Sequence, residues 1–218
     1  MELNGLKINF LGDSITEGAK VTDTENNIYW QRLRNNDGCI VRGYGVGGTR
    51  IAKQNSPSDN PRTDLDFIFR VDDMDPDADA IVVFGGTNDF GHGDAAMGKM
   101  DDRCDNTFYG ALHTLYTKLI NKYPQAQIIV MTPLHRLNEK AAYNNRGLRN
   151  VGTLEDYVNA IIKVAGYYSI PVLDLYRVSG MNPEVEIIRE KYMPDGLHPS
   201  DAGQEKIYQK LKEFIKKL

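Results

Sequence analysis

The sequence has few cysteines and no long apolar run. Cys39 and Cys104 are its two cysteines, too few for the disulfide framework of a small secreted domain. No apolar run approaches the ~20 residues that a membrane-spanning helix requires. The first seven residues also lack the charged-then-apolar order of a signal peptide. We therefore expect a cytoplasmic protein, although a chain from which a signal peptide had been removed would look the same.

Positive charge is also not in excess. The chain has 26 Lys and Arg residues against 30 Asp and Glu residues, a formal net charge of -4, which disfavours a nucleic-acid partner. The 4 histidines are scattered and have no metal-ligand spacing, so no metal site is expected. The length of 218 residues suits one α/β domain spanning residues 1–218.

Short apolar runs alternate with amphipathic stretches along the chain. The runs predict five buried strands, and the 3.6-residue periodicity of the longer stretches predicts helices between and after them. This alternation predicts a three-layer α/β/α sandwich with a five-stranded parallel sheet and a flavodoxin-like strand order. The expected strands are 7–11, 39–44, 80–84, 128–131 and 171–174, the expected helices are 27–35, 108–120, one from Thr153 and one from Asp201, and the expected loops are 53–64, 90–105 and 135–152.

Polar residues follow several of these strands. Ser14, Gly48 and Asn88 each come after a strand, and Asp195 and His198 follow the last one. The carboxyl ends of parallel strands share one edge of a sheet, so these five residues can meet there. Each also has a structural alternative, because serine and aspartate cap helices, asparagine holds turns and histidine can tie down a loop. Their convergence at one edge favours chemistry.

The residue types suit ester hydrolysis by a serine. Such a reaction needs a nucleophile, a base, a group that orients the base, and donors for the oxyanion. His198 can take and return a proton near neutral pH, and Asp195 lies close enough in sequence to orient its imidazole. The backbone N–H groups of Ser14 and Gly48, with the Asn88 amide, would face the oxyanion.

These residues stand in four motifs that resemble the conserved blocks of the SGNH (GDSL-type) hydrolases. The blocks occur in the family's order over nearly the whole chain: Gly12-Asp13-Ser14, Gly48, Gly86-Thr-Asn88-Asp89 and Asp195-Gly-Leu-His198. The resemblance implies the SGNH hydrolase fold and no metal or organic cofactor. It also implies that Ser14 is the nucleophile, His198 the base and Asp195 its orienting acid, with Ser14, Gly48 and Asn88 forming the oxyanion hole.

The second block departs from the family pattern. Many members carry asparagine a few residues before the glycine, where this chain has Gly43 or Gly45. Gly47 therefore remains an alternative to Gly48 as the oxyanion donor.

Two other classes of function have weaker support. Gly43-Tyr-Gly45-Val-Gly-Gly48 matches a dinucleotide-binding fingerprint, which also requires a helix to begin at the glycines. Residues 49–64 contain two prolines and no apolar periodicity, which disfavours that helix. A non-catalytic ligand-binding module would be expected if the nucleophile were missing, and here it is present.

The predicted edge loops are polar and include no long apolar lid. They favour a short acyl group, acetyl first, on a polar alcohol such as a carbohydrate. Lysophospholipase or thioesterase activity is the alternative that the family resemblance leaves open. Asp13, His92 and Arg136 are candidates for substrate contact. The expected partner is a small-molecule or oligosaccharide ester, with no nucleic acid and no membrane, and the sequence does not indicate an oligomeric state.

Overall fold

The computed structural model describes all 218 residues and contains one five-stranded sheet. Its strands pair in parallel in the order β2-β1-β3-β4-β5. This order confirms the predicted flavodoxin-like sheet. The strands are β1 (Lys7–Gly12), β2 (Ile40–Gly45), β3 (Ala80–Phe84), β4 (Gln127–Met131) and β5 (Val172–Leu173).

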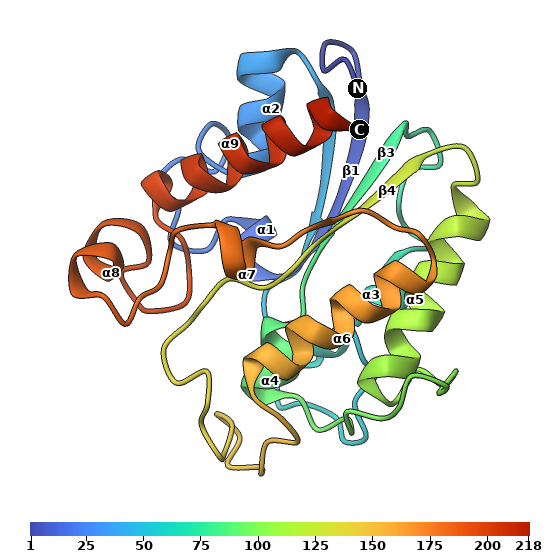
Figure 1. The fold of residues 1–218 in the computed structure, drawn as a ribbon, viewed down its shortest axis with the longest axis vertical. Helices are drawn as coiled ribbons and strands as arrows, with labels where there is room; N and C mark the ends of the chain where they lie inside the picture. Colours follow the sequence, from blue (N-terminus) through green and yellow to red (C-terminus); the bar gives the residue numbers. More distant parts are fainter.

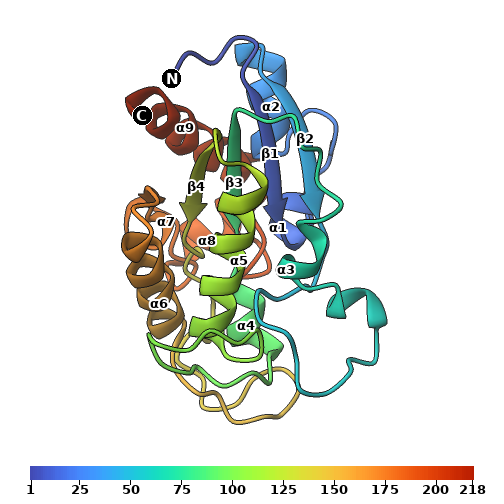
Figure 2. The same ribbon diagram turned by 90° about the vertical axis from the view of Figure 1, so that its right-hand side faces the viewer.

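Helices cover both faces of the sheet, which confirms the three-layer arrangement (Figures 1 and 2). Side chains alternate between the faces along each strand. In β3, Val82 and Phe84 join one buried cluster, whereas Ile81 and Val83 join the other. The first cluster includes residues of α2 (Tyr29–Asp37) and α9 (Asp201–Lys217), and the second includes residues of α3 (Phe67–Arg70), α5 (Phe108–Lys122) and α6 (Leu154–Tyr167).

The long helices begin at side-chain caps. Thr153 and Asp156 form the predicted capping box at the start of α6. The closing helix α9 is capped by Ser200, whose hydroxyl accepts from the Gly203 N–H. The sequence pattern placed this cap near Asp201, and the structure places it one residue earlier, at Ser200.

Short helices lie around the carboxyl edge of the sheet: Figure 1 shows α1 (Ser14–Glu17) and α7 (Leu175–Val178) near the middle of the view, α8 (Glu186–Tyr192) at its left and α4 (Thr87–His92) toward its bottom. The sequence did not distinguish α3, α7 and α8 from loops, because four to seven residues carry too little periodicity. The predicted loop at 90–105 in fact begins inside α4, which ends at His92. The remaining short element is η1 (Pro61–Asp64).

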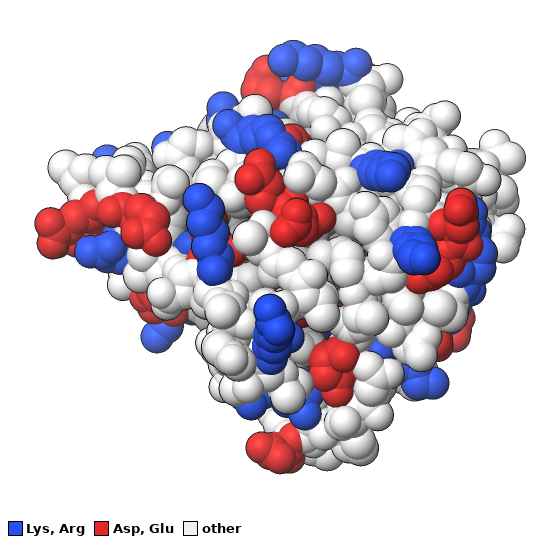
Figure 3. Space-filling model, turned by 60° about the horizontal axis from the view of Figure 1, so that its bottom comes forward, with Lys and Arg blue, Asp and Glu red and all other residues white.

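Charged side chains of both signs lie on the end of the molecule that is at the bottom of Figure 1. Lys and Arg side chains are interspersed with Asp and Glu around broad uncharged areas (Figure 3). None of the helices is both long enough and apolar enough to span a bilayer.

The interior strand β1, which leads to Ser14, depends on a buried aromatic contact. Phe10 is 0% exposed and packs against the rings of Tyr29 and Trp30, with centroids 5.7 and 6.1 Å away. We expect Phe10→Ala to lower the free energy of unfolding in urea by about 3–5 kcal/mol. Phe69 is 58% exposed, so Phe69→Ala should change it by less than about 0.5 kcal/mol. Equal losses in the two variants would contradict this packing.

Candidate active site

A tight turn at the end of β1 presents Ser14. A Cβ at Gly12 would collide with the Thr16 side chain, so the strand has to end at glycine. Asp13 is the N-cap of α1 and accepts the Ile15 N–H at 3.0 Å. Ser14 is thus the first helical residue and not the cap, which leaves its hydroxyl free for other contacts.

The hydroxyl of Ser14 contacts a histidine from the far end of the chain. Ser14 Oγ lies 2.9 Å from His198 Nε2, and His198 Nδ1 lies 2.8 Å from Asp195 Oδ2. The carboxylate accepts the Nδ1 proton, so Nε2 is left unprotonated to accept from the serine hydroxyl. The structure therefore brings Ser14, His198 and Asp195 together in one hydrogen-bonded chain.

A short turn holds Asp195 under the imidazole. Its Oδ1 atom accepts the backbone N–H groups of Leu197 at 3.0 Å and His198 at 2.7 Å. Gly196, between Asp195 and Leu197, adopts a left-handed conformation with φ +77. Burial opposes ionisation of Asp195, but the hydrogen bonds from His198 and Leu197 outweigh it and hold the pKa of the carboxyl below its ordinary value. Asp195 therefore stays an anion while it orients the imidazole.

Three donors without acceptors lie beside the serine. The backbone N–H groups of Ser14 and Gly48 make no hydrogen bond within the protein, whereas the Gly47 N–H donates to Glu17 Oε2 at 2.8 Å. The Asn88 amide donates one N–H to the Thr49 carbonyl at 3.0 Å and keeps the other free. The geometry thus favours Gly48 over Gly47 as the oxyanion donor.

These groups open into a pocket of about 370 Å³. Ser14, Gly48, Asn88 and His198 line it together with His92, Arg136 and Asn145, and its only apolar side chains are those of Ala19 and Leu197. The candidates His92 and Arg136 therefore do lie at the site. Asp13 does not: its carboxylate is 1% exposed and turned toward α1, because capping the helix keeps it inside. The prediction that Asp13 contacts substrate was wrong.

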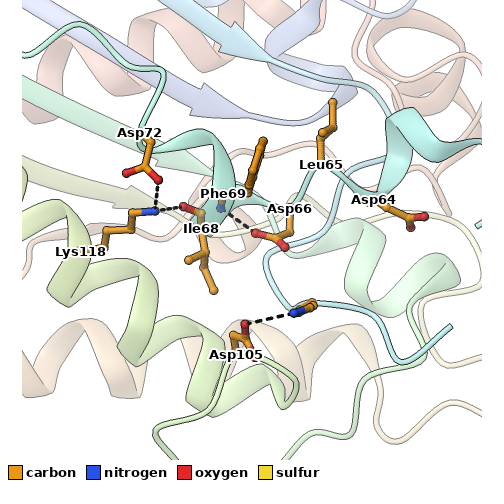
Figure 4. Close-up of a pocket in the computed structure, with 9 residues that line it drawn as sticks. Asp64, Leu65, Asp66, Ile68, Phe69, Asp72, Asp105 and Lys118 are labelled. Carbon is orange, nitrogen blue, oxygen red and sulfur yellow. Dashed lines mark hydrogen bonds and ion pairs between the residues drawn. The ribbon is translucent and has the colours of Figure 1, made fainter. Parts of the chain in front are cut away.

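A larger hollow of about 460 Å³ lies elsewhere, against α3 and α5 (Figure 4). It is lined by Asp64, Asp66, Asp72 and Asp105 with two lysines, and Lys118 donates to Asp72 at 2.8 Å. It contains no hydroxyl or imidazole that could act as a nucleophile or base. Nowhere in the structure do His, Cys, Asp and Glu side chains gather as a metal site would require.

His92 is held as a neutral imidazole in the pocket wall. Arg50 Nη1 donates to His92 Nδ1 at 2.9 Å, so the proton of the neutral ring is on Nε2. Burial and then the charges of Arg50, Arg136 and Arg146 lower the pKa of His92 to about 4. His92 can therefore offer an N–H donor to a ligand at neutral pH.

Two buried ionisable side chains to which the sequence assigns no role, Asp89 and Arg70, hold the loops of the site. Asp89 accepts the backbone N–H groups of Ile51 at 3.0 Å and Ala52 at 2.9 Å, and burial raises its pKa to about 7. Arg70, 5% exposed, donates to the Gly12 carbonyl at 3.1 Å and to Thr49 Oγ1 at 2.9 Å. Asp89 stands in the third motif block and Arg70 between Phe69 and Val71, but neither position indicates which distant backbone groups the side chain binds.

The dinucleotide alternative does not fit the second block. No helix begins between β2 and η1, so the glycines at 43–48 do not lead into a helix N-terminus. A pyrophosphate would lack the aligned N–H groups that the fingerprint depends on.

A parallel α/β sheet whose carboxyl edge carries a hydrogen-bonded serine, histidine and aspartate has the arrangement of a serine hydrolase. Comparison with known proteins narrows this class. The model of the GDSL-like lipase/acylhydrolase family matches residues 10–206, and the chain belongs to this family. It is accordingly an ester-hydrolysing enzyme. No curated protein matches the chain.

Several solved structures share the fold. A protein from Lactobacillus plantarum is 30% identical, with a TM-score of 0.81 over 98% of each chain. A lipase/acylhydrolase from Enterococcus faecalis is 21% identical, with a TM-score of 0.66 over 97% of this chain and 95% of its own. The acetyl xylan esterase AlAXEase is 20% identical, with a TM-score of 0.64 over 96% of this chain and 100% of its own. At 21% and 20% identity, the last two show the likeness of fold alone.

Because the pKa of His92 is lowered in the folded protein, we expect the free energy of unfolding to depend on pH through this residue. An unfolded chain binds a proton at a histidine below pH 6.5, whereas folded His92 does so only near pH 4. Lowering the pH from 7 to 5 therefore favours the unfolded state, by about 2 kcal/mol for this group. In urea titrations at the two pH values, wild type should lose about that much more stability than His92→Gln, whose amide oxygen can still accept from Arg50. Equal losses would contradict a neutral His92.

Proposed function

We propose that the protein is a serine esterase that works through an acyl-enzyme, and one observation carries this proposal. The Asp195–His198–Ser14 chain ends at a polar pocket beside three N–H donors that have no protein acceptor. Donors aimed at the place where charge develops lower the barrier because they need no reorganisation during the reaction.

The geometry supports a two-step reaction. Ser14 Oγ attacks the ester carbonyl carbon while His198 Nε2 takes the hydroxyl proton, and the negative charge moves to the carbonyl oxygen. His198 then gives the proton to the leaving alcohol as the C–O bond breaks, which leaves an acyl group on Ser14. Water repeats the sequence, and the acid and the free serine are released. Asp195 stays ionised throughout and stabilises the imidazolium.

The pocket supports a short acyl group on a polar alcohol. The pocket has a volume of about 370 Å³, and only two apolar side chains line it. It therefore offers little apolar surface to a long acyl chain. An adjoining hollow of about 150 Å³ is lined by Asn138, Asn144, Asn145 and Asn150, and amides can both donate to and accept from hydroxyl groups. We therefore propose an acetyl ester of a carbohydrate-like alcohol. The name of one fold neighbour, an acetyl xylan esterase, is compatible with this substrate class.

The nucleophile can be tested by removing one oxygen atom. We expect Ser14→Ala to lower turnover of p-nitrophenyl acetate by several orders of magnitude, on the scale of ~10⁶ known for loss of a serine nucleophile. Exposed Ser56 contributes no side-chain hydrogen bond, so Ser56→Ala should retain the wild-type rate. A Ser14→Ala protein that hydrolyses the ester as fast as wild type would end the proposal.

The acyl-chain preference can be tested separately. We expect kcat/KM to fall from p-nitrophenyl acetate to butyrate to octanoate, because the pocket wall is polar. The same series distinguishes the alternative within the family: a preference for octanoate would favour a lysophospholipase or thioesterase and would overturn the acetyl assignment.

A further inference from the structure

Arg136 is a buried cation without a carboxylate partner. Its side chain is 9% exposed, and none of the ion pairs in the structure includes it. Nη1 donates to the Thr87 carbonyl at 3.1 Å and to Thr87 Oγ1 at 3.3 Å. Nη2 has no protein acceptor, and Nε is fully buried without one. The guanidinium thus has an unsatisfied edge.

The other two deeply buried arginines differ in this respect. Arg50 forms an ion pair with Asp64 at 2.6 Å, and Arg70 donates to Leu65, Gly12 and Thr49 as well as Tyr44. An unpaired buried charge costs free energy, and burial lowers the pKa of Arg136 accordingly. Arg50 also has a buried Nε without a partner, but its charge is paired with that of Asp64. Arg136 has neither an ion pair nor a protein acceptor for Nη2, and it lies at the pocket, so it is available to a ligand.

The position of Arg136 indicates which part of the ester it would meet. Arg136 lines both the pocket at Ser14 and the adjoining asparagine-lined hollow. The amides of Asn138 and Asn145 form no side-chain hydrogen bond within the protein. They flank Arg136 and suit hydroxyl groups, so the hollow fits the alcohol part of the ester better than a short acyl group. Figure 3 shows that charge of both signs surrounds this end of the molecule, so the preference arises from one buried group and not from a basic surface.

We propose that Arg136 binds a carboxylate on the alcohol part of the substrate, so that the enzyme acts on acidic esters. The Nη2 donors of Arg136 can bind a carboxylate oxygen, and such charge-assisted hydrogen bonds are shorter and stronger than neutral ones. His92 offers a neutral N–H donor from the neighbouring wall of the pocket. The inference rests on the proposed esterase function for the chemical step but not for binding.

Two esters of the same shape test it by kinetics. 4-Acetoxybenzoate carries a carboxylate on the alcohol part, and 4-acetoxybenzamide carries a neutral amide at the same place. We expect Arg136→Gln to lower the ratio of kcat/KM for benzoate over benzamide by about 10- to 100-fold relative to wild type, mainly through KM. Comparing ratios removes the intrinsic reactivity of the two esters. This substitution removes the charge and keeps a polar side chain. The exposed Arg149 of the same loop supplies the control Arg149→Gln, which should keep the wild-type ratio.

A binding measurement separates this inference from the esterase proposal. 4-Hydroxybenzoate and 4-hydroxybenzamide are titrated into the Ser14→Ala protein by calorimetry, and we expect the carboxylate to bind about tenfold tighter or better. This comparison also decides the case if Arg136→Gln does not fold. An unchanged kinetic ratio in folded Arg136→Gln, or equal binding of the two compounds, would overturn the role of Arg136. Absence of all esterase activity in wild type with binding retained would instead overturn the esterase proposal alone.

Discussion

One contact of 2.9 Å, between the Ser14 hydroxyl and the His198 imidazole, joins residues at opposite ends of the chain. The surrounding structure fixes both sides of it. Asp13 caps α1 and so fixes where this helix begins. Asp195 accepts from both the backbone N–H and the Nδ1 atom of His198, which fixes the position of the imidazole. Gln204 links the two sides directly, because it donates to the Ile15 carbonyl at 3.2 Å and accepts the Tyr29 N–H at 3.1 Å. This buried amide on α9 therefore anchors the closing helix to the helix that carries the serine.

The site depends on buried charged groups more than on the sheet itself. Strands bring Ser14, Gly48 and Asn88 only to the same edge, and their N–H groups must still point at one place. Asp89 and Arg70 supply that precision by binding backbone groups of the loops. Burial opposes the charged form of each group, which raises the pKa of Asp89 and lowers that of Arg70. A preorganised site thus carries a cost in stability, as expected when donors must be fixed before the reaction begins.

The parts that could be predicted from the sequence have local patterns. β3 is a continuous β-branched and aromatic run, and α6 begins at a capping box, so both were expected close to their observed bounds. Ser14, Asp195 and His198 were expected together because each follows a strand. Arg70 and Asp89 could not be assigned in this way, since their partners are loop backbone groups far away in sequence. Asp13 was misjudged because its neighbour is the nucleophile, whereas its own carboxylate serves the helix.

The groups proposed for the chemical step and for selectivity lie on different segments of this fold. The hydroxyl and the oxyanion donors belong to residues that directly follow β1, β2 and β3, where the central sheet limits what can change. Arg136 and Asn145 instead belong to the long loop after β4, whose backbone is tied to the site at two points: Leu137 N–H to the Gly196 carbonyl and Asn145 N–H to the Gly91 carbonyl, both at 2.9 Å. These ties use backbone atoms, and the Leu137 side chain also lies against Gly196 of the Asp195 turn. The role that we propose for the Arg136 guanidinium therefore concerns which ester is bound and not how it is cleaved.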